Sequence, residues 1–393
     1  MEATFYYNGM TGGPAPGTAG AGDLITVLDA CLVNGFNTVT LTSITRSGST
    51  ATATYTSHGF KAGQLVYIAG ASETEYNGNK RVLTVPDANT FTFTVSGTPA
   101  TPATGTITAK TPGLGWTKDY TGTNLATFRP AAGNRRWLRV DDTPTNNSII
   151  LGYNAMTAVS TGTDPFPNTT FVAANGLRIA KPNDTNGWFL VGNDRCFYLC
   201  AATSGSYWTY MFFGDAPSYK SGDTDNTMIM GCHIGSDTTA NGQTLSYFFA
   251  NNYGGAPNTA GSGPCLYRDY TGTGTIGAQG LVFSSFGTTG TQFLNKTTGL
   301  FNVGPSPITG GYHIGFVDAL ESISSINHPR MRMPGLITTP NKIDYSSYDK
   351  TYFGGVSSFG GIILKNMDSV NGGSSAGLAF ALCDWETVFA TGM

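Results

Sequence analysis

The acidic residues of this chain have the spacing for metal or acid–base chemistry at only a few places. Asp141 and Asp142 are adjacent, so on a strand their side chains face opposite sides and cannot share a substrate. Asp223 and Asp225 begin a D-x-D-N run that resembles the start of a calcium loop. The later Gly and Glu of such a loop are absent, so we expect a solvated turn there and no metal site.

Histidines and nucleophiles form no catalytic arrangement either. The run 373–377 matches the spacing G-x-S-x-G, but we expect no nucleophile elbow there, and the run 271–274 lacks the lysine of a phosphate loop. His58, His233, His313 and His328 stand alone, which favours structural roles, with His58 capping a turn. A glycosidase carboxylate pair needs only to be about 5–10 Å apart in space, so spacing cannot identify one. We predict no enzyme activity and no catalytic, cofactor-binding or metal-binding residues.

The cysteines predict buried thiols rather than a disulfide scaffold, because they are scattered singly. They are Cys31, Cys196, Cys200, Cys232, Cys265 and Cys383. Four residues along a strand separate Cys196 from Cys200 by about 13 Å, whereas the Cα atoms of a disulfide lie about 4.4–6.8 Å apart. The alternatives are an oxidised pair, or a zinc site that recruits Cys232 and His233 through a tight turn.

Composition is typical of short strands joined by tight turns. Charged residues make up 11% of the chain, against about 25% in an ordinary globular domain. A lone enzyme usually carries more charge for solubility, so this composition favours a subunit of a large assembly or a secreted β protein. Lys and Arg form no basic stripe, which argues against a nucleic-acid partner. The clusters Arg135, Arg136, Arg139 and Arg330, Arg332 predict surface salt bridges.

Neither membrane insertion nor a signal peptide is expected. No stretch approaches the ~18 apolar residues of a membrane span. The first five residues lack the basic region and the apolar core of a signal peptide. We therefore expect a protein that is made in a cytoplasm and that leaves it, if at all, by another route such as assembly into a particle.

One helix is predicted, over residues 23–34. Leu24 and Leu28 recur at helical spacing within a wider apolar face. The carboxylate of Asp23 can accept hydrogen bonds from the free N–H groups of the first turn. Gly35 then supplies the left-handed residue that ends the helix.

Residues 38–110 predict a small β-barrel inserted into a host domain. Apolar and hydroxyl residues alternate there between Gly, Pro, Asn and Asp turns, as in half-buried antiparallel strands. The predicted strands are 38–42, 50–55, 64–68, 81–85, 90–95 and 104–109. A helix precedes the segment and a chain of different texture follows it. Surface loops tolerate such insertions, so we expect the two ends of the barrel to lie close together.

The remainder predicts a larger β-sandwich-like main domain over 111–393, to which residues 1–37 add an N-terminal arm and the helix. Its strands are predicted at 127–129, 137–140, 148–153, 188–191, 196–200, 207–213, 227–234, 245–250, 280–286, 361–365 and 378–385. Aromatic rings at 207–213 and 247–249 fall on both faces of their strands. The second face belongs either to another core layer or to a contact with sugar or a neighbouring subunit. The predicted fold class is all-β.

A weak internal repeat is also present. The run Lys-Asp-Tyr-Thr-Gly-Thr at 118–123 returns as Arg-Asp-Tyr-Thr-Gly-Thr at 268–273. The match could mark two related halves, or it could arise by chance in a chain rich in Thr and Gly.

Several of these segments resemble known phage proteins. The runs 57–60, 63–66, 76–78 and 89–93 are similar to a small barrel module of many tailed-phage virion proteins, often likened to a β-barrel domain of ubiquitin-activating enzymes. The likeness covers the barrel alone and implies no catalytic role. The flanking runs 22–36, 115–118, 121–124, 138–142, 162–167 and 213–215 resemble a family of uncharacterised phage structural proteins. The resemblance spans most of residues 1–290.

The resemblance implies a structural component of a tailed-phage virion, in the tail, baseplate or fibre-attachment apparatus. Its partners would be other copies of itself, in a homo-oligomer of closed symmetry, and other virion proteins. One alternative is a head-decoration or neck protein. The alternative from another class is a carbohydrate-binding or glycan-cleaving host-adsorption protein, whose partner would be a host surface glycan.

Two segments are predicted to make the subunit contacts. The first is the N-terminal arm, residues 2–19, in which a short strand over 3–7 precedes a loop rich in Gly, Pro and Ala. The second is residues 328–336, which read as an extended crossing loop. Both carry apolar or Arg side chains of the kind found in interfaces. We expect an isolated subunit that lacks residues 2–19 to stay folded.

Overall fold

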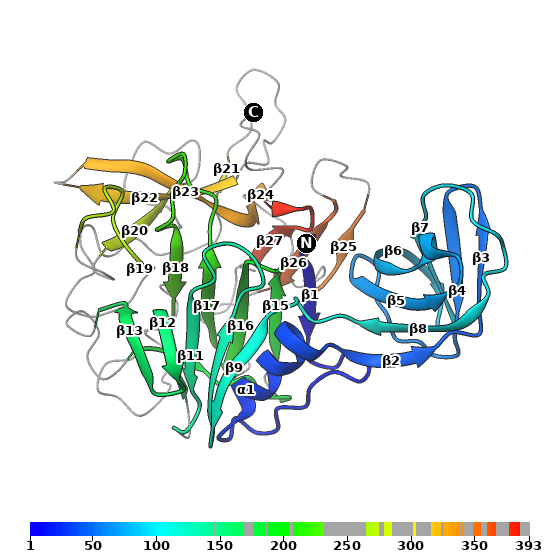
Figure 1. Cartoon of the computed structure of the whole chain (residues 1–393), viewed down its shortest axis with the longest axis horizontal. Coiled ribbons are helices and arrows are strands. Elements are labelled where there is room, and N and C mark those ends of the chain that lie inside the picture. The colour runs from blue at the N-terminus through cyan, green and yellow to red at the C-terminus, as the bar shows by residue number, and fades with distance from the viewer. Residues whose placement is uncertain are drawn as a thin grey trace.

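A small β-barrel is carried on the side of a larger β body in the computed structural model of the chain (Figure 1). The structure describes residues 1–144, 147–168, 176–185, 187–204, 207–231, 265–274, 279–284, 302–303, 316–323, 326–337, 339–340, 349–354, 360–366 and 377–385. Strands form nearly all of the regular structure in these ranges, which confirms the all-β fold class.

Strand alternation builds the barrel, all of whose residues, 36–111, are described. Seven strands follow the order β2-β8-β5-β6-β7-β4-β3. They are β2 (Phe36–Thr40), β3 (Ser43–Ser47), β4 (Thr50–Thr54), β5 (Leu65–Ala71), β6 (Gly78–Asp87), β7 (Thr90–Thr94) and β8 (Gly105–Thr111), with a 3-10 turn η2 (Thr74–Tyr76). On β7, Phe91 and Phe93 are fully buried while Thr94 is exposed, as the period of two requires.

The two ends of the barrel lie side by side. Strands β2 and β8 pair antiparallel, with Phe36 opposite Thr111. At the other side of the barrel, the N–H of Ala103 donates to the carbonyl of Ile44 at 2.8 Å, which brings the segment before β8 onto β3. The chain therefore enters and leaves the barrel at one place, as expected. That residues 38–110 form a separable domain stays a prediction.

A large curled sheet forms most of the body. Across the described residues its order is β1-β15-β16-β17-β18-β19-β20-β22-β23-β27-β26-β25. The strands are β1 (Thr4–Tyr7), β15 (Trp188–Gly192), β16 (Cys196–Ser204), β17 (Tyr207–Asp215), β18 (Thr227–Met230), β19 (Cys265–Leu266), β20 (Gln279–Ser284), β22 (Phe316–Ile323), β23 (Ile326–Ile337), β25 (Tyr352–Phe353), β26 (Ile362–Asn366) and β27 (Gly377–Ala381). The N–H of Ala3 donates to Cys383 O at 3.3 Å, so the first strand meets the segment that follows β27.

A smaller sheet packs on the outside of this curl. Its order is β13-β12-β11-β10-β9, with β14 beside β12. The strands are β9 (Thr117–Gly122), β10 (Leu125–Arg129), β11 (Trp137–Asp141), β12 (Asn147–Ala158), β13 (Thr161–Phe166) and β14 (Leu177–Ala180). A further pair, β21 (Asn302–Val303) and β24 (Thr339–Pro340), runs parallel.

The middle strands of the large sheet are buried on both faces. Phe212 of β17 belongs to the core inside the curl. Its neighbours Met211 and Phe213 belong to the core between the two sheets. The second face of this strand is thus another core layer, and the alternative of a sugar or subunit contact is wrong for residues 211–213. The rings at 247–249 lie outside the described residues, as does the strand predicted at 245–250.

The predicted helix is present over residues 23–34. It begins as α1 (Asp23–Leu28) and continues as a wider π-helical turn, η1 (Asp29–Asn34). Leu24 and Leu28 are fully buried in the core between the two sheets. Gly35 ends the helix at φ 69° and ψ −177°, a positive-φ conformation that favours glycine but differs from the left-handed helical cap predicted for it. Within the described ranges, no helix is long and apolar enough to span a membrane.

Both segments predicted to make subunit contacts contain strands of the fold, and that they also contact other subunits stays a prediction. The arm contains β1, which pairs with β15 and buries Phe5 and Tyr6. The predicted crossing loop is part of β23, which pairs with β22 and β27 and buries Met331 and Met333. Prolines suggested a loop there, but shifts of register between β22 and β23 accommodate them. An isolated subunit without residues 2–19 should therefore not stay folded.

The internal repeat does not mark two related halves. Residues 118–123 lie almost wholly in β9. Residues 268–273 form a turn after β19, in which Asp269 Oδ1 accepts a hydrogen bond from Gly272 N at 3.0 Å. One six-residue pattern therefore takes two conformations, because the surroundings decide which it adopts.

Candidate functional site

The adjacent aspartates at the end of β11 face opposite sides, as predicted. Asp141 pairs with Arg139 on the same strand, with 3.5 Å between the closest charged atoms. Asp142 is fully buried, and its Oδ1 lies 2.6 Å from Lys181 Nζ. Lys181 also donates to the carbonyls of Gly20 and Asp142 at 2.8 and 2.7 Å, so the three N–H bonds of its ammonium all have acceptors.

Asp142 also caps the helix, and the prediction that Asp23 would do so is wrong. Oδ2 of Asp142 accepts from the backbone N–H groups of Leu24 and Ile25 at 2.8 and 3.2 Å. Asp23 instead accepts from the N–H of Gly20, in the loop before the helix. The cap is supplied by a residue more than a hundred positions away in sequence, so no local pattern pointed to it.

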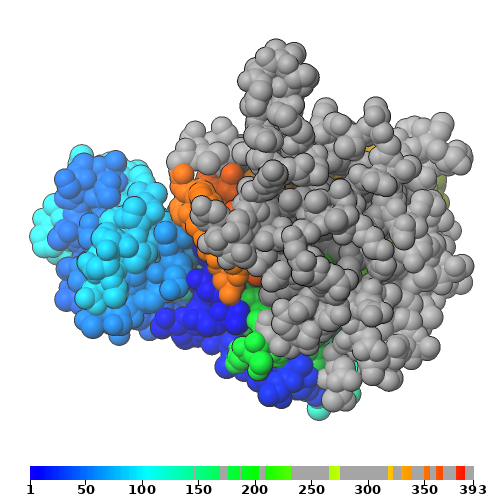
Figure 2. Space-filling view, turned by 180° about the vertical axis from the view of Figure 1, so that it is seen from behind, coloured from blue at the N-terminus to red at the C-terminus, as the bar shows by residue number. Residues whose placement is uncertain are grey.

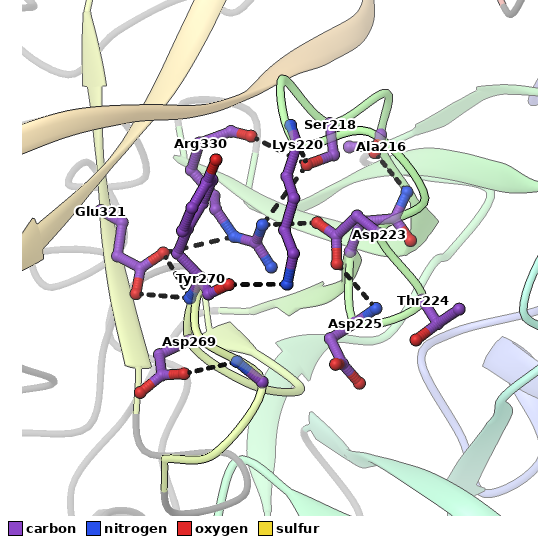
Figure 3. Close-up of polar contacts among 12 residues, drawn as sticks. Ala216, Ser218, Lys220, Asp223, Thr224, Asp225, Asp269, Tyr270, Glu321 and Arg330 are labelled. Atoms are coloured by element: carbon purple, nitrogen blue, oxygen red, sulfur yellow. Dashed lines mark hydrogen bonds and ion pairs between the residues drawn. The ribbon is translucent and has the colours of Figure 1, made fainter.

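A second buried charge cluster surrounds Arg330 of β23. Its guanidinium pairs with Asp223, and its Nε lies 3.3 Å from Glu321 Oε2 on β22. The side chains of Arg330, Asp223 and Glu321 are at most 1% exposed. Figure 3 shows Arg330 between the two carboxylates. The prediction of a surface salt bridge at Arg330 is therefore wrong. The turn around Asp223 lies at the surface, as predicted, with Ser221, Gly222 and Thr224 exposed, but the side chain of Asp223 itself is buried and neutralises Arg330.

The cluster holds two surface turns in place. Both carboxylate oxygens of Glu321 accept from the N–H of Tyr270 at 3.0 Å, in the turn after β19. The carbonyl of Tyr270 accepts from Lys220 Nζ at 2.7 Å. Lys220 and Asp223 belong to the turn between β17 and β18, so the two turns are linked to each other and to β22 and β23 (Figure 3).

The second aspartate of the D-x-D-N run has an arginine of its own. Arg136, which is 7% exposed, reaches Asp225 Oδ1 at 3.3 Å and donates to Thr224 O at 2.9 Å. Its guanidinium carbon lies 3.7 Å from the ring centre of Tyr267. Asp223 and Asp225 are thus divided between two buried arginines and do not converge on a cation.

The electrostatics of the Arg330 cluster favour a structural role. Burial raises the pKa of Glu321, and the amide of Tyr270 and the charge of Arg330 oppose this rise. A carboxyl with a raised pKa is suited to general acid catalysis only where a substrate reaches it. Here Glu321 and Asp223 share the guanidinium of Arg330 and are almost inaccessible to a substrate. The cluster therefore holds the turns at 216–226 and 267–274 against the sheet.

Histidines and cysteines take the structural roles predicted for them where they are described. Nδ1 of His58 accepts from Phe60 N at 3.0 Å in a buried turn. Cys31, Cys196, Cys200, Cys265 and Cys383 are buried thiols, and Cys196 and Cys200 lie on one strand. Cys232, His233 and His313, and the side chain of His328, lie outside the described residues. Within those residues no three His, Cys, Asp or Glu side chains gather as metal ligands.

The joint between the barrel and the body is centred on Arg81 of β6. Nη2 of Arg81 lies 2.8 Å from Glu2 Oε2, 2.9 Å from Ala3 O and 2.6 Å from Leu382 O. The other terminal nitrogen donates to Gly63 O within the barrel at 2.6 Å. A single barrel side chain therefore ties together the two terminal segments of the body.

Comparisons with known proteins add little to this geometry. No family model matches the chain, and no curated protein does. A solved structure described as "Phage phi92 endosialidase" overlaps 54% of this chain and 37% of its own length, at 18% identity and a TM-score of 0.17. The chain thus spans about a third of that protein, and a TM-score this low supports no inference about fold or activity.

Proposed function

We propose that the protein is a structural component of a tailed-phage virion, in the tail, baseplate or fibre-attachment apparatus, and that it acts through contacts between subunits. The resemblance to phage structural proteins over most of residues 1–290 supports this proposal. The low share of charged residues, 11%, fits a chain whose surface is largely covered by neighbours.

The observation that carries the proposal is the joint at Arg81. A barrel that serves a symmetric assembly has to hold a fixed position relative to its body, because one repeated contact must satisfy every copy. Arg81 fixes that position through the backbone of Ala3 and Leu382. The N–H of Leu65 on β5 donates to Thr4 Oγ1 at 2.9 Å and adds a second tie.

The experiment compares two neighbouring variants in particles. Quantitative mass spectrometry of purified virions of the encoding phage should find this chain at a fixed copy number. Arg81→Ala should lower that copy number, because the barrel loses the contacts of Arg81 with Glu2, Ala3 and Leu382 of the body. Lys80→Ala should not, because the described hydrogen bond of Lys80, to Glu75 O, lies within the barrel. Absence of the chain from particles, or equal incorporation of both variants, would overturn the proposal.

A further inference from the structure

A groove of about 730 Å³ lies where the barrel meets the body. Its barrel side includes Leu83 on β6, Thr94 on β7 and Ser96 just beyond it. Its body side includes Glu2 and Tyr352. Figure 2 shows residues 349–354 and 360–366, in orange, lying against the blue barrel. Sites between two structural units are common positions for ligands, and volumes of about 300–1,000 Å³ are typical of them.

The walls of the groove are held in place before any ligand arrives. The ring of Tyr352 fits closely against two glycines, one from each wall. A Cβ at Gly63 of the barrel would lie 2.3 Å from the ring, and one at Gly361 of the body would lie 2.2 Å from it. Together with Arg81, this contact sets the width of the groove, which lowers the entropy cost of binding.

The lining mixes hydrogen-bonding groups of both kinds with apolar surface. Thr94 and Ser96 are exposed hydroxyls, and Asn79 is an exposed carboxamide. Glu2 presents a carboxylate that is 54% exposed. Leu83, which is 39% exposed, places an apolar side chain beside these groups.

The charges of the groove are largely balanced. Arg81 is paired with Glu2 at 2.8 Å, and the Met1 amine is paired with Asp194 at 2.9 Å. Lys80 also lines the groove, and its Nζ donates to the carbonyl of Glu75 at 2.6 Å without a carboxylate partner among the described residues. A polyanion would therefore find at most one positive charge that lacks an ionic partner. An apolar ligand would leave the hydroxyls and the carboxamide without partners, which costs free energy. A ligand rich in hydroxyls that also has C–H faces satisfies both parts of the lining.

We propose that this groove binds a short neutral oligosaccharide. The sugar hydroxyls bond to Asn79, Thr94, Ser96 and the free oxygen of Glu2, and a C–H face of one sugar ring packs on Leu83. This inference does not depend on the proposed virion role, because that role requires only contacts between subunits.

The test uses saturation-transfer NMR on the intact chain. The probes are neutral trimers of glucose, galactose and N-acetylglucosamine, with a trimer of galacturonic acid as the acidic comparison. At least one neutral trimer should receive saturation, and the acidic trimer should not. Binding of none of the neutral trimers, or preferential binding of the acidic trimer, would overturn the proposal.

Three variants locate the binding. Ser96→Trp should abolish it by filling the groove. Leu83→Ala should weaken it roughly tenfold, by removing buried apolar contact. Thr45→Ala is the control, because Thr45 is an exposed barrel residue on β3, a strand that contributes no residue to the lining of the groove. An unchanged affinity of Ser96→Trp, an equal loss in Thr45→Ala, or a dimer in light scattering contradicts the proposal. Thermal unfolding checks that each variant is folded.

Discussion

A guanidinium between two carboxylates is stable in a protein interior only while all its partners remain. Removing one member leaves an uncompensated buried charge, which typically costs about 3–5 kcal/mol. Arg330 holds two carboxylates and is fully buried, whereas Arg332, two residues along β23, is 20% exposed in its pairing with Asp318. The two arginines therefore differ in burial while sharing a strand and a charge.

We expect Arg330→Leu to lower the free energy of unfolding by about 3 kcal/mol or more, because Asp223 and Glu321 lose their shared partner. Arg332→Leu should cost less than Arg330→Leu, because Arg332 and its carboxylate partner, Asp318, both keep some contact with water. Urea unfolding followed by fluorescence measures both. Similar losses for the two variants would show that the Arg330 cluster does not hold the turns as described.

His58 gives the barrel a dependence on pH. Burial lowers the pKa of His58, although hydrogen bonds and the charge of Asp87 partly oppose this. The folded state therefore favours neutral His58. Below the ordinary pKa of about 6.5 the unfolded chain binds more protons than the folded one. The stability that neutral His58 contributes is thus fully present above about pH 6.5 and is lost as the pH falls towards the lowered pKa.

We expect the unfolding temperature of the wild type to fall between about pH 7 and pH 5 by more than that of His58→Asn. The asparagine carbonyl can accept from Phe60 N where Nδ1 of His58 now accepts, so the turn keeps its hydrogen bond without a titrating group. Differential scanning calorimetry across this range compares the two proteins. Parallel pH profiles would show that His58 does not contribute.

At the scale of the elements, the helix at 23–34 depends on a residue from another strand. Asp142→Ala removes the acceptor of two N–H groups at the start of the helix and leaves Lys181 buried without its carboxylate. We expect a loss of about 3 kcal/mol or more, measured by chemical unfolding. Asp23→Ala should cost about 1 kcal/mol, because it removes hydrogen bonds from the loop before the helix, at Gly20 and Ala19, and leaves the cap of Asp142 in place.

A double variant separates the two roles of Asp142. Asp142→Ala with Lys181→Met removes the unpaired charge, so it should recover part of the loss while the helix stays uncapped. A double variant no more stable than Asp142→Ala alone would mean that the charge of Lys181 contributes nothing to the loss.

Strands were predictable wherever their neighbours imposed a simple pattern. Phe91 and Phe93 alternate with threonines because one face of β7 meets the barrel core and the other meets water. Trp188 to Val191 form an unbroken apolar run because β15 is buried on both faces. Strand β23 escaped prediction because its prolines resemble those of a loop, and only its pairing with β22 and β27 shows otherwise.

At the scale of the whole molecule, the charged clusters carried no sequence signal. Asp223 and Arg330 are 107 residues apart, and each looked like an ordinary surface residue next to its own neighbours. The barrel, in contrast, was predictable because it is local in sequence: all its strands fall within residues 36–111. Contacts between residues that are near in sequence can be predicted from the sequence pattern. Contacts between distant residues, which the folding of the large sheet brings together, cannot.

The pairing of β2 with β8 predicts how the molecule tolerates loss of the barrel. Replacing residues 39–109 by a short Gly-Ser link should leave the remainder cooperatively folded, because the chain resumes beside the point where it left. Some stability should be lost with the ties of Arg81 and Leu65 to the body. Circular dichroism during thermal unfolding tests this. Insoluble protein, or a broad transition without cooperativity, would mean that the body needs the barrel to fold.

The same pairing determines how a pulling force would travel through the chain. A load that arrives at Phe36 can cross directly to Thr111 on the adjacent strand, about 5 Å away, so it bypasses the barrel while β2 and β8 stay joined. If they separate, their hydrogen bonds break one after another and the barrel unravels. That would release up to roughly 250 Å of chain, at about 3.3–3.6 Å per residue. Under sufficient tension the barrel can therefore unfold and lengthen the chain.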